Sequence, residues 1–311
     1  MSGGAGADLP ATGEWATHAS GRSFPCGHAT PSAIAAGPFF VAILLRAPRA
    51  RRTVAAGHTV GMRLIGRSIV GPRRYLAAMT EFVLVAGAWL GSWAWDGVVP
   101  ELRAAGHGVH ALTLSGLAEK QGVQAGQQTH VQDIVGEVER LDLRDVVLVG
   151  HSYSGIPVGQ AAERIGDRLA HVVFVDSNVP EDGGSFLSAW PGGRSMVEAS
   201  MAANGGFWAP LTEADCHGQG LTEEQIGRLV GGATPHPGTT LSEPAVLARP
   251  LGGLPATYIK CLLDGAEPTD DVAELLKSEH WRLVEMDTGH WPMFSQPREL
   301  ARILLRCAGA S

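Results

Sequence analysis

The stretch Val146-Val-Leu-Val-Gly-His-Ser-Tyr-Ser-Gly155 decides how this chain folds. Its first four residues are an apolar run rich in β-branched side chains, which is typical of a buried strand. The residues that follow lead into a helical pattern over 154–164. A serine on such a sharp strand-to-helix turn exposes its hydroxyl above the sheet edge, and its neighbours must be small because strand and helix pass close to it. We therefore expect Ser152 to be a nucleophile.

Short apolar runs and helical patterns alternate on both sides of this stretch. Strands are expected at 82–86, 109–114, 171–175, 256–263 and 282–286. Helices are expected at 93–105, 129–141 with Thr129 as N-cap, 272–276 and 297–306. Strands that alternate with helices form right-handed βαβ units, so the sequence predicts an α/β fold with a mostly parallel sheet covered on both faces.

Residues 180–252 interrupt this alternation. Glycines and prolines there separate short helical pieces such as 222–229, and the segment carries several aromatic side chains. An aromatic-rich insertion between two sheet strands suits a small helical lid over a binding site. A plain surface excursion is the alternative interpretation.

A serine hydroxyl is a weak nucleophile, so Ser152 needs a base that is itself oriented by an acid. At this kind of turn the chain order is serine, acid, histidine. Asp264 ends the strand expected at 256–263 and His290 follows the strand expected at 282–286. Because the carboxyl ends of parallel strands meet at one edge, we predict a triad of Ser152, Asp264 and His290.

The choice of the acid leaves alternatives open. Glu267 and Asp270 lie close to Asp264 in the sequence. Asp176, at the end of an earlier strand, could also reach the histidine. Strand-end placement favours Asp264 among these four carboxylates.

Two backbone N–H groups are expected to bind the oxyanion of the reaction intermediate. One belongs to Tyr153, at the start of the helix after the nucleophile. The other belongs to Ala88, in the loop after the first strand, where Gly87 lets the backbone approach the site. Aromatic side chains are expected to line an apolar substrate pocket, with core packing as the alternative: Trp89, Trp190, Phe207, Trp208 and Trp291.

Charge is distributed unevenly along the 311 residues, whose net charge is −7. Residues 1–78 hold nine arginines and two acids, a net of +7, whereas residues 79–311 hold 15 basic and 29 acidic side chains, a net of −14. The overall acidity argues against nucleic acid or an anionic membrane as a partner. Residues 1–78 lack a periodic pattern, and Met79 opens onto a strand, so we expect a disordered extension or a misplaced start there.

The remaining patterns bear on compartment and cofactors. The longest apolar run, residues 33–45, carries Pro38 and is shorter than the roughly 20 residues of a membrane span. Its arginines follow it, which is unlike a secretory signal. The four cysteines show no paired spacing and suit free thiols in a reducing, cytoplasmic compartment. The other histidines show no metal-ligand spacing and there is no Gly-rich phosphate loop, so no metal or cofactor is expected.

Together these residues resemble the α/β-hydrolase superfamily, in particular the compact branch of plant methylesterases, hydroxynitrile lyases and many bacterial esterases. The resemblance runs from Met79 to about Arg306 and implies a Ser–His–Asp triad without a cofactor. Ser154 replaces the last glycine of the usual G-x-S-x-G pattern, and Ala86 replaces a histidine that usually precedes the oxyanion-loop glycine. Trp291 follows His290 where the lyases have lysine, which favours an esterase.

These observations favour hydrolysis of a small-molecule carboxylic ester or lactone that carries an apolar or aromatic group. Carbon–carbon bond hydrolysis, acyl transfer and cofactor-free oxygenation would use the same three residues. A ligand-binding protein that kept the fold without catalysis is a further alternative. Epoxide hydrolysis and dehalogenation are disfavoured because in this fold they use a carboxylate nucleophile. The sequence does not fix the oligomeric state.

Overall fold

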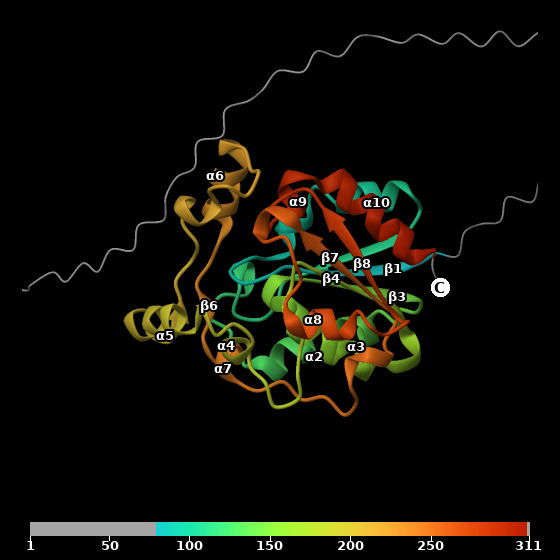
Figure 1. Cartoon of the computed structure of the whole chain (residues 1–311), viewed down its shortest axis with the longest axis horizontal. Coiled ribbons are helices and arrows are strands. Elements are labelled where there is room, and N and C mark those ends of the chain that lie inside the picture. The colour runs from blue at the N-terminus through green and yellow to red at the C-terminus, as the bar shows by residue number, and fades with distance from the viewer. Residues whose placement is uncertain (1–78, 310–311) are drawn as a thin grey trace, which may run out of the picture. The chain divides into compact units, whose positions relative to one another are not determined.

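The computed structural model describes residues 79–309, and the expectation for residues 1–78 lies outside the described residues. Within this range the principal sheet has the strand order β2-β1-β3-β4-β7-β8, and all neighbouring strands are parallel (Figure 1). This confirms the α/β fold with a parallel sheet. The strands are β1 (Glu81–Val85), β2 (Gly108–Leu112), β3 (Val146–His151), β4 (Leu169–Val175), β7 (Ala256–Cys261) and β8 (Trp281–Met286).

Both faces of the sheet are buried. Side chains alternate between the two faces along each strand, so neighbouring residues belong to different core clusters. Val83 and Val85 of β1 join one core cluster, whereas Phe82 and Leu84 join the other. Figure 1 shows that α2, α3 and α8 cover one face while α9 and α10 cover the opposite face. The helices are α1 (Val99–Ala104), α2 (Gln127–Arg140), α3 (Gly155–Ile165), α8 (Asp270–Leu275), α9 (Pro292–Ser295) and α10 (Pro297–Ala308).

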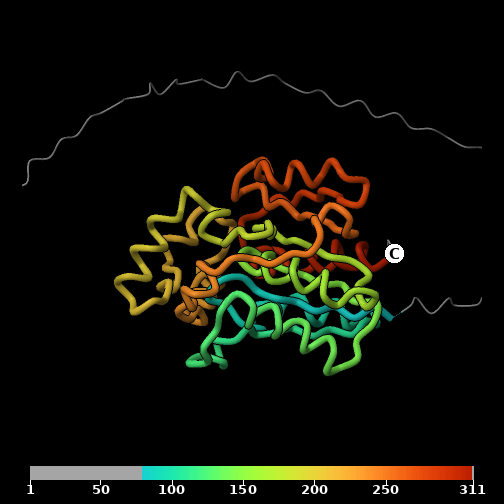
Figure 2. Tube along the Cα trace, turned by 90° about the horizontal axis from the view of Figure 1, so that it is seen from below, coloured from blue at the N-terminus to red at the C-terminus, as the bar shows by residue number. Residues whose placement is uncertain are grey.

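The 180–252 insertion lies between β4 and β7 and beyond one end of the sheet (Figures 1 and 2). Its short elements match the glycine and proline punctuation of the sequence. Thr222, predicted to begin a helical piece, caps α6 by accepting a hydrogen bond from the Gln225 N–H. The elements are α4 (Phe186–Ala189), α5 (Arg194–Ala203), β5 (Phe207–Trp208), α6 (Glu223–Gly232), β6 (His236–Pro237) and α7 (Thr239–Ser242).

Two local expectations were wrong. The segment 93–105 is not one helix, since a 3-10 turn at Ser92–Trp95 precedes α1, whose second residue is Pro100. Proline lacks an N–H and fits the first turn of a helix, so α1 begins there. Thr129 is not the N-cap of α2, because the helix begins two residues earlier and the Thr129 hydroxyl accepts the N–H of the cap residue Gly126 instead.

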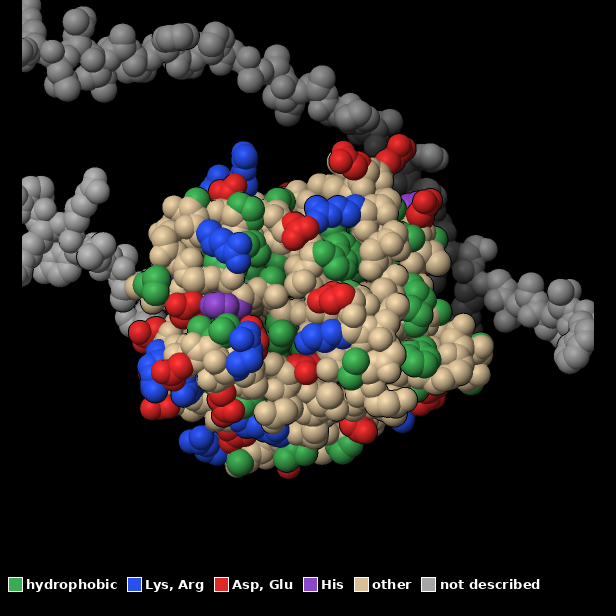
Figure 3. Space-filling model, turned by 180° about the vertical axis from the view of Figure 1, so that it is seen from behind, with side chains coloured by type: hydrophobic (Ala, Val, Ile, Leu, Met, Phe, Trp, Pro, Cys, Tyr) green, Lys and Arg blue, Asp and Glu red, His purple; other side chains and the backbone are tan. Residues whose placement is uncertain are grey.

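No helix in the range 79–309 is long and apolar enough to cross a membrane. Cys216, Cys261 and Cys307 are free thiols, as expected, whereas Cys26 lies outside the described residues. On the face drawn in Figure 3, Lys and Arg side chains are interspersed with Asp and Glu side chains. The cytoplasmic location and the absence of nucleic-acid and membrane partners stay predictions.

Candidate active site

Ser152 lies on the turn between β3 and α3, as the sequence predicts. Its φ of 55° is in the left-handed region, which is uncommon for a non-glycine residue. A side chain at Gly150 would meet the Val158 Cβ at 3.0 Å, and one at Gly155 would meet the Asn178 carbonyl oxygen at 2.1 Å. The start of α3 thus passes close to β3 at Gly150 and to the residues after β4 at Gly155, and the turn leaves the Ser152 hydroxyl at the sheet edge.

Ser154 occupies the position at which glycine is more usual, and the structure explains why serine fits. Its side chain is fully buried. The hydroxyl donates to the Val85 carbonyl oxygen of β1 at 2.8 Å and accepts the His151 N–H at 2.9 Å. Because every polar contact is internal, the hydroxyl stabilises the turn without entering the pocket.

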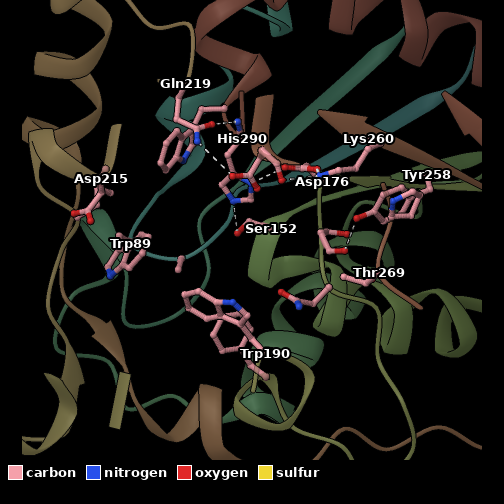
Figure 4. A pocket seen from close by; sticks show the side chains of 18 of the residues that line it. Trp89, Ser152, Asp176, Trp190, Asp215, Gln219, Tyr258, Lys260, Thr269 and His290 are labelled. Carbon is pink, nitrogen blue, oxygen red and sulfur yellow. Dashed lines mark hydrogen bonds and ion pairs between the residues drawn. The ribbon is translucent and has the colours of Figure 1, made fainter. Parts of the chain in front are cut away.

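His290 lies beside Ser152, in the loop between β8 and α9. Its Nε2 is 2.9 Å from the Ser152 Oγ (Figure 4). Its backbone is held from two sides, since the His290 N–H donates to the Gln219 Oε1 at 2.6 Å and its carbonyl accepts the His151 Nε2–H at 2.7 Å. The imidazole is therefore placed within hydrogen-bond reach of the hydroxyl that it would deprotonate.

Two carboxylates contact the other ring nitrogen of His290. The Nδ1 atom is 2.8 Å from the Asp176 Oδ2 and 3.2 Å from the Asp264 Oδ2. The acid predicted from strand order and the alternative acid therefore both reach the histidine. Asp176 follows β4 and is buried, whereas Asp264 follows β7 and its side chain is 39% exposed.

Lys260 is an additional buried charge at this place. Its Nζ donates to the Asp176 Oδ1 at 2.7 Å and to the Asp264 carbonyl oxygen at 3.1 Å. The Cys261 N–H donates to the same Asp176 oxygen at 3.2 Å. Buried carboxylates need such partners, because an isolated ion in the protein interior is strongly unfavourable.

The surroundings of His290 change its affinity for protons. Burial lowers the pKa of His290, but the hydrogen bonds and negative charges of Asp176 and Asp264 outweigh this and raise the pKa to about 9. The opposite effect acts on Asp264, whose pKa is held below its usual range by the contact with His290 although burial opposes this. Both carboxylates thus favour a positively charged imidazole, the species that forms when Ser152 is deprotonated.

The loop after β1 carries three consecutive N–H groups, those of Gly87, Ala88 and Trp89. The first and the third donate to histidine rings, and Ala88 lies at the pocket. The Gly87 N–H donates to the His151 Nδ1 at 3.2 Å, and the Trp89 N–H donates to the His236 Nδ1 at 3.3 Å. The Ala88 N–H has no hydrogen-bond partner within residues 79–309. Ala88 also lines the pocket around Ser152, where the geometry suits an oxyanion donor.

The two histidines that hold this loop are neutral. Burial lowers the pKa of His151 to about 3 and that of His236 well below its usual value. In each ring Nδ1 accepts a loop N–H, so Nε2 carries the proton and donates, in His236 to the Thr240 Oγ1 at 2.8 Å. A neutral imidazole has one ring nitrogen that can accept a hydrogen bond, and the N–H groups of Gly87 and Trp89 each need such an acceptor.

A pocket of about 540 Å³ opens above Ser152 and His290, between the strand ends and the insertion. Tryptophan rings form one of its walls, with the Trp89 and Trp208 ring centroids 4.1 Å apart and those of Trp190 and Trp208 6.1 Å apart. Figure 4 shows Trp89 and Trp190 on the insertion side of Ser152, and Tyr258 and Lys260 on the other side. The size and lining suit a small apolar or aromatic compound.

Four of the five aromatic residues expected at the pocket line it: Trp89, Trp190, Trp208 and Trp291. Phe207 does not line the pocket and is 42% exposed, so that expectation was wrong. Neighbouring residues of a strand face opposite sides, and in β5 it is Trp208 that faces inward. The sequence pattern alone did not show which of the two would face the site.

Sequence reasoning missed Lys260, His236 and Gln219. The sequence does carry a signal for Lys260. A lysine within an apolar strand is rarely buried without a partner, so its place in β7 predicts a nearby carboxylate. His236 and Gln219 lie in the insertion, and their partners Trp89 and His290 are distant in sequence, so no local pattern indicates the contacts.

Asp176, Asp264 and His290 are also of the types that bind metals, and their candidate ligand atoms lie within 4.8 Å of one another. Here the Lys260 ammonium occupies one Asp176 oxygen, and the Oδ2 atom of each carboxylate faces the His290 Nδ1. This set suits a hydrogen-bonded relay more than a metal centre. That no metal takes part stays a prediction, which unchanged turnover after dialysis against a chelator would support.

The comparisons agree with this fold. The Alpha/beta hydrolase family matches residues 82–303, which is most of the described range. The chain therefore belongs to the α/β-hydrolase family. The match includes Ser152, Asp176, Asp264 and His290.

Two curated proteins and one solved structure illustrate what this chain is similar to. The "Carbendazim hydrolyzing esterase" of Nocardioides sp. is 31% identical over 240 residues, which cover 73% of this chain and 98% of that protein. Methylesterase 2 of Arabidopsis thaliana is 28% identical, with 73% and 95% covered. A solved extracellular α/β-hydrolase from a Paenibacillus species has a TM-score of 0.66 at 23% identity, covering 73% and 98%, and so supports the fold. Relatives named as esterases indicate an enzyme of the esterase type.

Proposed function

We propose that this chain is a serine esterase that cleaves a carboxylic ester or lactone with an apolar or aromatic group through an acyl-enzyme. The observation that carries the proposal is the contact between the Ser152 Oγ and the His290 Nε2, at 2.9 Å, with carboxylates on the opposite ring nitrogen. Nucleophile, base and acid in this order form the relay that acyl transfer needs. Asp264 is the acid that chain order favours.

The proposed reaction begins when Ser152 attacks the ester carbonyl carbon. His290 takes the hydroxyl proton on Nε2 while Nδ1–H stays hydrogen-bonded to the carboxylates. The N–H groups of Ala88 and Tyr153 stabilise the oxyanion. His290 then gives the proton to the leaving alcohol, and a water molecule, deprotonated by the same nitrogen, releases the acid and restores the serine.

The pocket and the relatives support the substrate class. A wall of tryptophans favours an apolar or aromatic group over a strongly hydrated one. The relatives are named for hydrolysis of carbendazim and of methyl esters. A substrate panel should therefore contain carbendazim, aromatic methyl esters, p-nitrophenyl esters and lactones, together with diketones and hydroxyquinolones as probes of the other reactions that a serine relay permits.

The proposed function is tested by Ser152→Ala, measured as turnover of p-nitrophenyl acetate. We expect a loss of at least about 10⁴-fold in kcat with an unchanged circular dichroism spectrum, because the nucleophile is removed and the fold is not. Ser195→Ala is the matched control, since Ser195 is exposed on α5. Turnover by Ser152→Ala equal to that of the control would remove the mechanism.

A further inference from the structure

The His290 Nδ1 carries one proton, and two carboxylates lie close enough to accept a hydrogen bond from it. The Asp176 Oδ2 is 2.8 Å and the Asp264 Oδ2 is 3.2 Å from the same nitrogen. A relay of one serine, one histidine and one acid needs a single acceptor at this position. The second carboxylate therefore calls for an explanation.

The two acids differ in how firmly they are held. The Asp176 side chain is 2% exposed and that of Lys260 is 7% exposed, and they form a buried ion pair at 2.7 Å. The Cys261 N–H also bonds to Asp176. Asp264 is 39% exposed, and its carboxylate also contacts the Gln219 Nε2 at 3.4 Å. Asp176 is thus the more fixed partner of the histidine.

The backbone of Asp176 gives an independent indication. Its φ of 42° lies in the left-handed region, directly after β4, just as Ser152 adopts 55° directly after β3. Non-glycine residues rarely adopt this conformation, and those that do gather at functional sites. This backbone geometry turns the side chain at the end of β4 toward the sheet edge where His290 lies (Figure 4).

We propose that Asp176 is a second positioning residue of the relay, which shares the His290 Nδ1 proton with Asp264, and that the buried ion pair with Lys260 holds Asp176 in place. The inference rests on the proposed serine-esterase function. During attack the Ser152 proton moves to Nε2 and the Nδ1 proton stays on the ring, so neither carboxylate gains a proton. Asp176 holds the ring through its buried ion pair, and Asp264 holds it from the pocket side.

The charged and titratable groups around His290 come from three strands and the residues that follow them. Asp176 follows β4, Lys260 lies on β7, Asp264 follows β7, and His151 ends β3 with its ring centroid 4.9 Å from that of His290. His151 is neutral, since burial lowers its pKa. Gln219 contributes an uncharged amide from the insertion. Removal of either carboxylate should therefore lower the pKa of His290.

The experiment compares Asp176→Asn, Asp264→Asn and the double variant with wild type, using kcat, KM and the pH dependence of kcat/KM for p-nitrophenyl butyrate. Each single variant should lose no more than about 10²-fold in kcat, and the double variant about 10⁴-fold, the loss known for removal of a sole acid. Both single variants should show an apparent pKa below that of wild type. Asp271→Asn is the matched control, because Asp271 is an exposed aspartate on α8.

A titration of His290 by NMR measures the same property without turnover, so it separates this inference from the proposed function. The His290 pKa should fall in Asp176→Asn and in Asp264→Asn and stay unchanged in Asp271→Asn. If Asp176→Asn leaves the titration of His290 and the pH profile as in wild type, the proposed role is wrong. It is equally wrong if Asp264→Asn alone loses as much kcat as the double variant.

Asp176→Asn leaves the Lys260 ammonium buried without its partner, which is strongly destabilising, so a second variant is needed. Asp176→Asn combined with Lys260→Met removes both charges together and leaves no unpaired ion. The combined variant should fold, retain turnover through Asp264 and still titrate His290 at a lower pH than wild type. An unchanged titration in this variant would also overturn the inference.

Discussion

The carboxyl edge of the sheet and the 180–252 insertion bend their backbones in different ways. At the edge, non-glycine residues adopt the left-handed region, with φ of 66° at Trp89, 55° at Ser152 and 42° at Asp176. Within the insertion the positive φ values all belong to glycines: Gly183, Gly205, Gly206, Gly218 and Gly220. Glycine adopts this conformation without strain, whereas other residues need surroundings that hold them there. The edge therefore stores strain at the residues of the proposed chemistry.

The two regions also differ in what holds them. The edge is fixed by buried hydrogen bonds such as those of His151, Ser154 and Lys260. The insertion contributes aromatic rings, some of them partly exposed, to the pocket wall. We expect substitutions at the edge to lower kcat and substitutions in the insertion to change KM, because only the edge contacts the reacting atoms.

The largest effect is expected for His290→Ala, which removes the base at the edge. We expect kcat to fall by about 10⁶-fold, since the serine then lacks a proton acceptor. Steady-state turnover of p-nitrophenyl acetate measures this. His280→Ala, at an exposed histidine that precedes β8, should retain wild-type kcat. Equal losses in both variants would contradict the assignment of the base.

A smaller loss is expected for Gly87→Ala in the oxyanion loop. The new Cβ would lie 2.7 Å from the Ser152 Cβ and 2.9 Å from the His151 Nδ1, so the loop must shift and the Ala88 N–H with it. We expect kcat to fall by about 10²-fold, the loss typical of one missing oxyanion donor.

Gly227→Ala in α6 of the insertion is the matched glycine variant, because a Cβ there meets nothing within 4 Å. It should keep wild-type kcat and raise the free energy of unfolding by about 0.5 to 1 kcal/mol, as alanine favours helix. Urea unfolding measures the second value. A kcat lowered as much as in Gly87→Ala would remove the contrast between the two regions.

The pH dependence follows from the raised pKa of His290, about 9. The base must be unprotonated, and below this pKa the unprotonated fraction grows as the pH rises, so kcat/KM should increase about tenfold per pH unit. Initial rates corrected for spontaneous ester hydrolysis test this between about pH 6 and about pH 9. A profile that is already flat at neutral pH would show that the carboxylates do not raise the pKa in solution.

The smallest effect is expected for Trp190→Ala in the insertion. Trp190 lines the pocket but is 39% exposed, so its loss should raise KM for an aromatic ester roughly fivefold, the equivalent of about 1 kcal/mol, with kcat unchanged. Phe207→Ala is the control, because Phe207 is similarly exposed and does not line the pocket. A larger KM change in Phe207→Ala would reverse the assignment of the pocket wall.

The fold and much of the site could be predicted because the signals are local. An apolar strand, a tight turn and a helix place Ser152, and strand order brings His290 and Asp264 to the same edge. Strand positions followed from apolar runs whose ends shift by only a few residues in the structure, as β3 and β7 show. These features depend on backbone geometry that the sequence pattern specifies directly.

The parts of the site that the sequence does not predict depend on distances between segments far apart in the chain. Asp176 and Asp264 differ by a few tenths of an ångström in their approach to His290, which no spacing in the sequence reveals. Phe207 was expected at the pocket together with Trp208 but does not line it, because a strand of two residues has no alternation in the sequence that shows which side chain faces inward. The contact of His236 with the Trp89 N–H also joins segments far apart in the sequence, so no local pattern predicts it.

The most direct test of the central claim is covalent labelling by a fluorophosphonate, followed by peptide mapping with mass spectrometry. A hydroxyl activated by His290 should attack the phosphorus and carry the adduct at Ser152. Labelling of wild type at Ser152, with none in Ser152→Ala and strongly slowed labelling in His290→Ala, is the expected result. An adduct at another residue, or an unlabelled wild type that still hydrolyses esters, would contradict the relay.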